Sequence, residues 1–508
     1  MDSLIARLLA ASLFFAIFIA LRIKFRPRRL PLPPGPKGLP LVGNVLDMPK
    51  EQEWLTFAKW GEKWGDICSI TILGQTVIIL NSPEAATDML DKKSSIYSDR
   101  PILQMGGELV GWKNTMALLP YGERFRNYRR SFHRTIGTRS SVAQFHSPQE
   151  LETRRFLSRV LVNPGELSSH IRQAVGSVTL RITHGYETRE ANDPFIELAD
   201  KATNQFSLAT APGGWMVDFI PWLRHVPDWV PGTEFKQKAK AWSCTLNAMV
   251  DQPFEFVQKQ MAAGVAPPSF TSLLLESKQP HPEAENDIKW ISASLYSGAA
   301  DTTVSAIYAF FLAMVLHPDV ASKAQQEIEA VVGTERLPNF ADREHLPYVS
   351  ALTKEVLRWN SVVPLAVPHV ATQDDVHEGY FIPKGSLVMP NLWGMTHDPR
   401  RYRNPTVFNP ERFIPSEGRH VEPDPYDVVF GFGRRICPGS HLADATIFIT
   451  CAMSLAVFDI SKAVENGVTI EPVHDNTTGT ISRPKPFKCS ISPRSGKALS
   501  LIQSGEQE

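Results

Sequence analysis

A cysteine in a glycine-rich stretch is the residue of this 508-residue chain with the clearest capacity for chemistry. Cys437 lies in Phe430-Gly-Phe-Gly-Arg-Arg-Ile-Cys-Pro-Gly439, and a helix is expected to begin at about His441. The glycines at 431 and 433 allow turns that direct backbone N–H groups towards one point. Those donors, the helix N-terminus and nearby Arg435 would stabilise a thiolate. Taken alone, the stretch also suits a buried structural cysteine.

An acid and an alcohol are adjacent within a long apolar segment, in Ser297-Gly-Ala-Ala-Asp-Thr-Thr303. Asp and Thr compete for backbone hydrogen bonds, so they weaken a helix at this position. A carboxyl and a hydroxyl side by side can transfer protons. The alternative is a core helix without a chemical role.

Glu355 and Arg358 are three residues apart on a predicted helix, so they share one face of it. A pair at this spacing is usually a solvated surface ion pair. The segment alone does not decide between that interpretation and a buried pair.

The elements that must position these residues are mostly helical. Apolar periodicity predicts one long helix from Ile288 to Leu316 and amphipathic helices from Val320 to Val332 and from Leu346 to Trp359. Alternating residues on both sides of Gly74-Gln75 predict a β-hairpin, and Val376–Met389 predicts short strands. We expect a mainly α body with a small β portion and no internal domain boundary.

The N-terminus predicts a membrane anchor. Leu8–Leu21 has no charge and is followed by a basic cluster, which indicates a single span with the body in the cytosol. A cleaved secretory signal, the alternative, has its charge before the apolar run. We expect an anchor at 1–25, a basic and Pro-rich connector at 26–40 and a catalytic domain at 41–508. The anchor would lie in the endoplasmic reticulum membrane, with the catalytic domain in the cytosol.

Composition excludes several classes of protein. The formal net charge is zero, which argues against a nucleic acid partner. The five cysteines are scattered and contain no CxxC pair, which argues against a disulfide framework and a zinc site and favours a reducing compartment.

The cysteine stretch resembles the haem-binding loop of the cytochrome P450 family, FxxGxRxCxG, at all five fixed positions: Phe430, Gly433, Arg435, Cys437 and Gly439. The resemblance implies the P450 fold and one haem b, with Cys437 as the axial thiolate ligand of its iron. It also implies that Phe430 packs near the sulfur and that Arg435 pairs with a haem propionate. A thiolate ligand favours O–O cleavage.

Further segments resemble motifs of the same family. Asp301 and Thr302 take the positions of the acid–alcohol pair in (A/G)GxDT(T/S), which supplies protons during oxygen activation, with Ala299 in place of a more frequent Gly. Glu355 and Arg358 match its ExxR pair, with Arg412 in the place of the pair's later Arg partner. This cluster would serve folding and haem retention.

Two weaker matches concern the propionates. Phe125-Arg-Asn-Tyr-Arg129 resembles WxxxR, but Phe lacks the indole N–H, so only Arg129 is carried over. His369 lies where the family has a His or Arg; the alternative is a satisfied surface histidine.

The resemblance extends from the N-terminus through Cys489. Two segments, 97–101 and 483–494, look like those of fungal secondary-metabolism members similar to the O-methylsterigmatocystin oxidoreductases. The family resemblance implies a monooxygenase that uses O2 and NADPH-derived electrons from cytochrome P450 reductase, with cytochrome b5 as a further partner. Basic residues near Cys437 would meet an acidic partner: Arg126, Arg130 and Arg434. The alternatives are an O2-independent haem-thiolate isomerase or dehydratase, and a non-enzymatic haem carrier or sensor.

By the same resemblance four segments would line the substrate pocket: 102–119, 295–302, 362–367 and 477–481. Their apolar composition predicts a neutral, lipophilic substrate, with a terpenoid first and an aromatic polyketide second. Glu108 is the exception, because a carboxylate facing the pocket would select an amine; a solvent-facing Glu108 is the alternative.

Overall fold

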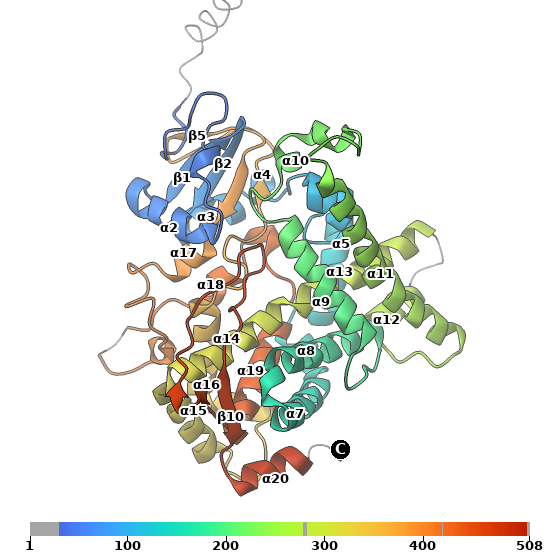
Figure 1. The fold of residues 1–508 in the computed structure, drawn as a ribbon, viewed down its shortest axis with the longest axis vertical. Coiled ribbons are helices and arrows are strands. Elements are labelled where there is room, and N and C mark those ends of the chain that lie inside the picture. Colours follow the sequence, from blue (N-terminus) through green and yellow to red (C-terminus); the bar gives the residue numbers. More distant parts are fainter. Residues whose placement is uncertain (1–29, 278–281, 419, 505–508) are drawn as a thin grey trace, which may run out of the picture.

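The computed structural model describes residues 30–277, 282–418 and 420–504. Helices dominate and strands are short, as expected from the sequence (Figure 1). The anchor predicted at 1–25 lies outside the described residues. Two apolar segments are long enough to span a membrane, Ala284–Leu316 and Ser440–Val457, but 72% and 78% of their most apolar windows are buried inside the protein. We therefore interpret both as core helices.

The largest sheet has four strands in the order β1-β2-β6-β3. The expected hairpin is present as β1 (Ile67–Ile72) and β2 (Gln75–Leu80), which pair antiparallel across a turn at Leu73 and Gly74. Gly74 has φ +87°, a conformation that glycine adopts without strain. β6 (Leu387–Pro390) runs parallel to β2, and β3 (His369–Val370) completes the sheet. β3 carries His369, which pairs with Val388 of β6.

The long helix predicted from 288 to 316 is interrupted, which corrects the sequence prediction. α13 (Pro282–Ala300) ends before Asp301, and α14 (Thr302–Leu316) begins after it. The Thr302 hydroxyl donates to the Gly298 carbonyl at 2.9 Å, so a side chain takes the acceptor that an unbroken helix would offer to a backbone N–H. The acid–alcohol pair therefore lies at a break between two helices.

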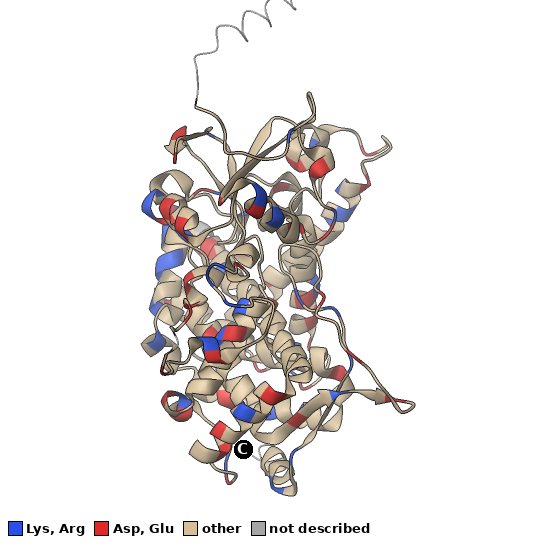
Figure 2. Ribbon diagram, turned by 90° about the vertical axis from the view of Figure 1, so that its left-hand side faces the viewer, with Lys and Arg blue, Asp and Glu red and all other residues tan. Residues whose placement is uncertain are grey.

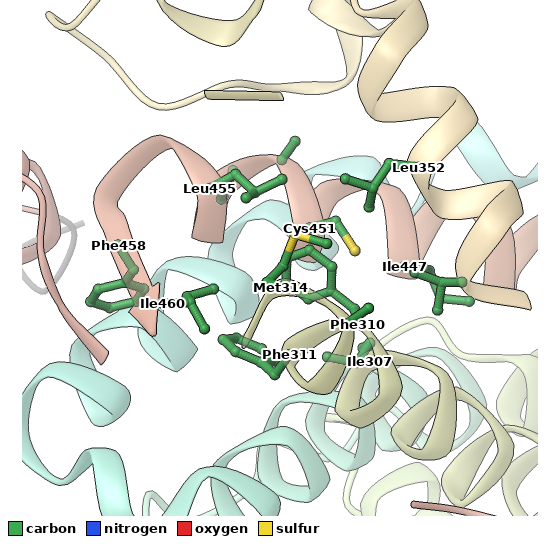
Figure 3. Close-up of a cluster of buried hydrophobic side chains, with 14 of the residues drawn as sticks. Ile307, Phe310, Phe311, Met314, Leu352, Ile447, Cys451, Leu455, Phe458 and Ile460 are labelled. Atoms are coloured by element: carbon green, nitrogen blue, oxygen red, sulfur yellow. The ribbon is translucent and has the colours of Figure 1, made fainter. Parts of the chain in front are cut away.

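The core joins α14 to α16 (Pro347–Trp359) and α19 (Ser440–Val457). Figure 3 shows Phe310 and Met314 of α14 close to Cys451 and Leu455 of α19, with Leu352 of α16 above them. All five are fully buried, and a buried side chain of this size contributes about 1.5–3 kcal/mol. This packing fixes the helix that begins at Thr302 against the helix that follows the cysteine loop.

The remaining helices and strands surround this core. α16 and α15 match the two predicted amphipathic helices, and β4 to β6 match the predicted short strands. The other main elements are α2 (Glu53–Trp64), α5 (Glu123–Ile136), α7 (His146–Val162), α8 (Leu167–His184), α9 (Pro194–Ala209), α10 (Met216–Phe219), α11 (Glu234–Ala262), α12 (Phe270–Ser277), α15 (Pro318–Val331), β4 (Asp375–His377), β5 (Tyr380–Ile382), β7 (Phe458–Lys462), β10 (Cys489–Pro493) and α20 (Gly496–Ser504).

Candidate active site

A cavity of about 360 Å³ lies in the centre of the protein. Its walls come from the cysteine loop, the α13–α14 junction, α9, and segments before α5 and after α16. Six of the residues predicted from the sequence line it: Thr302, His369, Phe430, Arg435, Cys437 and Gly439. Gly433, Arg129, Asp301 and the Glu355 cluster lie outside this lining.

The cysteine loop is held in place by its own backbone and by one close contact. The Cys437 N–H donates to the Phe430 carbonyl at 2.8 Å, which closes the loop ahead of α19. Gly433 has φ +54°, and a Cβ there would lie 2.2 Å from the Leu90 carbonyl oxygen. Only glycine fits this position, so its place in the motif follows from packing against the Thr87–Lys92 segment.

The cation that acts on the Cys437 sulfur is not the one expected from the sequence, which was Arg435. Burial raises the pKa of the Cys437 thiol, and the Gly439 N–H and the Arg129 charge oppose that shift only partly. Arg129 also donates to the Ile436 carbonyl, next to the cysteine. Arg129, rather than Arg435, is therefore the cation that favours the thiolate here, and a bound metal ion would favour it further.

Arg435 and Arg100 form a basic wall of the cavity. The Arg435 guanidinium donates to the carbonyls of Ser98 and Leu119, each at 2.7 Å, and lies 3.9 Å over the Phe125 ring. Burial lowers the pKa of Arg435 to about 10. Arg100 was not singled out from the sequence. It is 9% exposed, donates to the carbonyls of residues 117, 367 and 368, and has its pKa lowered by burial and by the neighbouring Arg435 charge.

His369 extends this wall as a neutral group. It is 3% exposed, which excludes the surface alternative, and its Nδ1 lies 2.7 Å from the Tyr97 carbonyl oxygen. Burial and the charges of Arg100 and Arg435 lower the pKa of His369 well below its usual range. A donor bond from Nδ1 leaves Nε2 as the free nitrogen of the ring.

The acid–alcohol pair is divided between the cavity and the region behind it. Thr302 lines the cavity, whereas Asp301 is 4% exposed and lies behind the wall. Arg483 Nη1 is 3.4 Å from Asp301 Oδ1. Burial raises the pKa of Asp301, and the Arg483 charge offsets part of this shift. Sequence reasoning did not identify Arg483.

The Glu355 cluster lies away from the cavity and is fully buried, so the surface interpretation is wrong. Glu355 and Arg358 are both 0% exposed and form two parallel bonds of 2.7 and 2.8 Å. Arg412 Nε lies 3.1 Å from Glu355 and its Nη1 lies 2.6 Å from Glu422. The cluster fixes α16 to the segment at 403–422.

All four segments predicted to line a substrate pocket reach the cavity. They contribute Trp112, Thr115, Met116, Ala117, Leu295, Ser297, Gly298, Ala299, Thr302, Val362, Val363, Ala366, Val367, Thr480 and Ile481. Glu108 is not among the residues that line the cavity. Its carboxylate pairs with Lys113 at 2.8 Å. An amine-selecting carboxylate is therefore absent from the cavity wall.

The residues present suit an iron porphyrin. Among the described residues no Asp or Glu lines the cavity, and neither Arg100 nor Arg435 forms an ion pair. The nearby Asp99 carboxylate acts on both charges but accepts from the backbone N–H groups of Arg100 and Tyr121, so the two guanidinium groups suit a ligand with anionic groups. Between residues 30 and 504, outside the two gaps, no group of three or more His, Cys, Asp or Glu side chains could hold a metal. A metal at Cys437 would therefore take its other ligands from a bound group.

The fold and this cysteine-lined cavity define a haem-thiolate enzyme, and the chain belongs to the cytochrome P450 family. A model of that family, described as Cytochrome P450, matches residues 33–491. The family binds haem through a cysteine thiolate ligand of the iron.

Proteins similar to this chain include fungal monooxygenases. The chain is 55% identical over 493 residues to Cytochrome P450 monooxygenase 208 of Postia placenta, covering 97% of this chain and 96% of the relative. It is 50% identical to Cytochrome P450 monooxygenase claR of Ampulloclitocybe clavipes, covering 94% and 89%. It is 43% identical to Cytochrome P450 monooxygenase ppsD of Aspergillus oryzae, covering 93% and 90%.

Proposed function

We propose that this chain is a membrane-bound monooxygenase of fungal secondary metabolism in which Cys437 is the axial ligand of one haem b. The observation that carries the proposal is that Cys437 and Thr302, from two different elements, line one cavity whose charged side chains are all cationic. Haem with a thiolate ligand activates O2 and favours O–O cleavage. Arg435 and Arg100 would bind the propionates, and Phe430 and Gly439 would lie beside the sulfur. His369 would join the two arginines only in its protonated form, because its Nδ1 donates to the Tyr97 carbonyl and a neutral Nε2 could only accept.

The residues at the helix break would handle protons. The Thr302 hydroxyl lies on the cavity wall, and its bond to the Gly298 carbonyl fixes its position. The Asp301 carboxyl does not line the cavity. It would exchange protons with the cavity through the Thr302 hydroxyl or through a water beside that hydroxyl. An O2-independent isomerase would have no use for this arrangement.

The substrate side of the cavity favours a neutral, lipophilic molecule. Met116, Leu295 and Val363 are typical of its walls. Of the two acids in the predicted segments, Glu108 is paired with Lys113 and Asp301 lies behind the wall, paired with Arg483. Each buried CH2 contributes about 0.8 kcal/mol, enough for micromolar binding without a charged contact. A terpenoid fits best, and an aromatic polyketide is second.

Electrons would come from NADPH through cytochrome P450 reductase, with cytochrome b5 as a further partner. Arg126, Arg130 and Arg434 are exposed, and Arg126 and Arg434 lie 5.9 and 5.2 Å over the same Tyr121 ring, so both flank the cysteine loop. Elsewhere basic and acidic residues are interspersed along the molecule (Figure 2). This local basic face suits an acidic partner.

Exposed apolar side chains support a membrane location, here proposed to be the endoplasmic reticulum with the catalytic domain facing the cytosol. The Pro31 carbonyl accepts a bond from the Phe381 N–H of β5, which places the start of the described chain beside the two-stranded β4–β5 sheet. Figure 1 shows the sheet and α10 at the same end of the molecule. At this end, Leu41 is 95% exposed and Trp222, just after α10, is 64% exposed, in keeping with contact with a lipid surface. We propose the anchor at 1–25, the connector at 26–40 and the catalytic domain at 41–508.

The test is turnover of a terpenoid panel by the full-length chain with reductase, NADPH and ¹⁸O2. We expect products that contain one ¹⁸O atom and NADPH consumption that depends on substrate. An isomerised product formed without NADPH would favour the O2-independent alternative. Haem binding without conversion of any member of a terpenoid and polyketide panel would favour a carrier.

A further inference from the structure

The hydroxyl groups on the cavity wall differ in whether they are already bonded to the protein. One set donates to the carbonyl four residues earlier in the chain: Thr179, Thr203, Ser294, Thr302 and Thr446. Thr115 donates to the Trp112 carbonyl, and Thr480 shares a hydrogen bond with Thr210. A hydroxyl that donates its hydrogen to the protein can only accept from a ligand.

Ser297 and Thr303 are the exceptions on this wall. Both line the cavity, and neither hydroxyl has a hydrogen bond within the part of the chain that the structure describes. Ser297 is partly exposed, whereas Thr303 is 5% exposed, so Ser297 has the more accessible hydroxyl. The Trp112 indole N–H is also unpaired among the described residues, but it is fully covered and cannot reach a ligand. Ser297 can therefore both donate to and accept from a molecule in the cavity.

The surroundings of Ser297 are apolar and fixed in place. Leu295 of α13 and Met116 line the cavity near it. Ser294, three residues before Ser297, accepts from the Met116 N–H at 3.0 Å and donates to the Trp290 carbonyl at 2.6 Å, so it holds the Met116 segment against α13. A substrate oxygen enclosed by such walls loses its water and needs a hydrogen-bond partner from the protein. Ser297 offers that partner.

Ser297 is also separate from the residue that handles protons. It lies five residues before Thr302, which is about 7.5 Å along the axis of a regular helix. An oxygen bonded to Ser297 and a carbon oxidised beside Thr302 would therefore belong to different parts of one substrate.

We propose that Ser297 is a specificity-determining residue whose hydroxyl binds a hydroxyl or carbonyl oxygen already present in the lipophilic substrate. This inference rests on the proposed function and narrows its substrate class from lipophilic molecules in general to oxygenated ones. Such a substrate must be supplied by a reaction that has already introduced oxygen into the carbon skeleton, by oxidation or by addition of water. The chain would then catalyse a later oxidation rather than the first one.

Two matched pairs of probes test the proposal by binding alone: α-cedrene with cedrol, and naphthalene with 2-naphthol. Equilibrium dialysis against the full-length haem protein gives the Kd of each probe without turnover. Ser297→Ala should weaken binding of the alcohol about three- to tenfold, as expected for one lost hydrogen bond, and should leave the Kd of the hydrocarbon within about twofold. Alanine is a better helix former than serine, so the variant should fold. The pair that shows the loss indicates a terpenoid or an aromatic skeleton.

Ser294→Ala is the matched control, because Ser294 lines the same wall but its hydroxyl is bonded to the protein. It should change the Kd of both members of a pair by the same factor. The proposal is overturned if Ser297→Ala raises the Kd of the alcohol no more than that of the hydrocarbon in both pairs. A selective loss in Thr303→Val instead of Ser297→Ala would also overturn it. Failure of the monooxygenase assignment is distinct, since it would show as the absence of a thiolate-type CO spectrum in the wild type.

Discussion

Two buried groups of charged side chains differ in whether they balance their own charge. In the cluster of α16, Arg358 and Arg412 are paired with Glu355 and Glu422, so two cations meet two carboxylates. In the cavity wall, the guanidinium groups of Arg100 and Arg435 donate to backbone carbonyls and form no ion pair among the described residues, because the nearby Asp99 carboxylate accepts from backbone N–H groups instead. The charges of the α16 cluster are paired within the folded chain. The two arginines of the cavity wall suit an anion from outside the chain. Charge balance therefore separates a folding element from a binding site.

Breaking the balanced cluster should have the largest effect. Glu355→Ala leaves two buried guanidinium groups without their shared carboxylate, a loss of about 3–5 kcal/mol in the free energy of unfolding. The free energy of unfolding of a typical domain is only a little larger than this loss, so we expect almost no haem-loaded protein. The yield of soluble protein and its haem content measure the effect.

The control lies on the same helix. Lys354 pairs with Asp424 at 2.6 Å, with both side chains about one-third exposed, so Lys354→Ala should cost about 0–1 kcal/mol. A soluble, haem-loaded Glu355→Ala protein as stable as Lys354→Ala would contradict the distinction between the two groups.

Removing Arg100 or Arg435 from the cavity wall should lower the affinity for haem more than the stability of the fold. Arg435→Met and Arg100→Met should each weaken haem binding about 10- to 100-fold, as expected for loss of a charge-assisted hydrogen bond. The free energy of unfolding of the haem-free chain should change less than in Glu355→Ala, because among the described residues neither arginine forms an ion pair, and Asp99 keeps its bonds to backbone N–H groups. Haem transfer to an acceptor protein and urea unfolding measure the two quantities.

The neighbouring, exposed Arg434 is the control for this comparison, and Arg434→Met should retain haem as the wild type does. If Arg435→Met destabilises the haem-free chain as much as Glu355→Ala does, the basic wall belongs to the fold.

The smallest structural effect is expected at the helix break. Thr302→Ala should leave stability and haem content nearly unchanged but divert O2 to hydrogen peroxide, because the hydroxyl supports proton delivery. Product formed per NADPH is the quantity to measure. Unchanged coupling would remove Thr302 from the mechanism and leave the proton path to bound substrate or water.

Local patterns in the sequence predicted much of this architecture. The β1–β2 hairpin and the helices α15 and α16 follow from alternation, periodicity and turn residues. The cysteine loop was also predictable, because Gly433, which only glycine fits, and Cys437 lie four residues apart in the sequence. Each of these features depends on neighbours along the chain.

Features that depend on distant segments were missed. Arg100 meets Arg435 only after folding, and Arg483 reaches Asp301 from 182 residues away. The helix break at Asp301 is a different case: apolar periodicity predicted one continuous helix, whereas the competition of Asp and Thr for backbone hydrogen bonds correctly indicated a weak point there. A signal for Arg100 did exist: it is an arginine in a short polar run, Tyr97-Ser-Asp-Arg100, ahead of the predicted pocket segment.

The central claim is that Cys437 is the thiolate ligand of the haem iron, and the CO spectrum of the reduced protein tests it most directly. The wild type should show the red-shifted Soret band that thiolate ligation produces, and Cys437→His should lose that band while retaining haem, because imidazole donates less electron density than a thiolate. Cys451→Ser, which changes a buried core cysteine away from the cavity, should keep it. A red-shifted band that persists in Cys437→His would contradict the assignment.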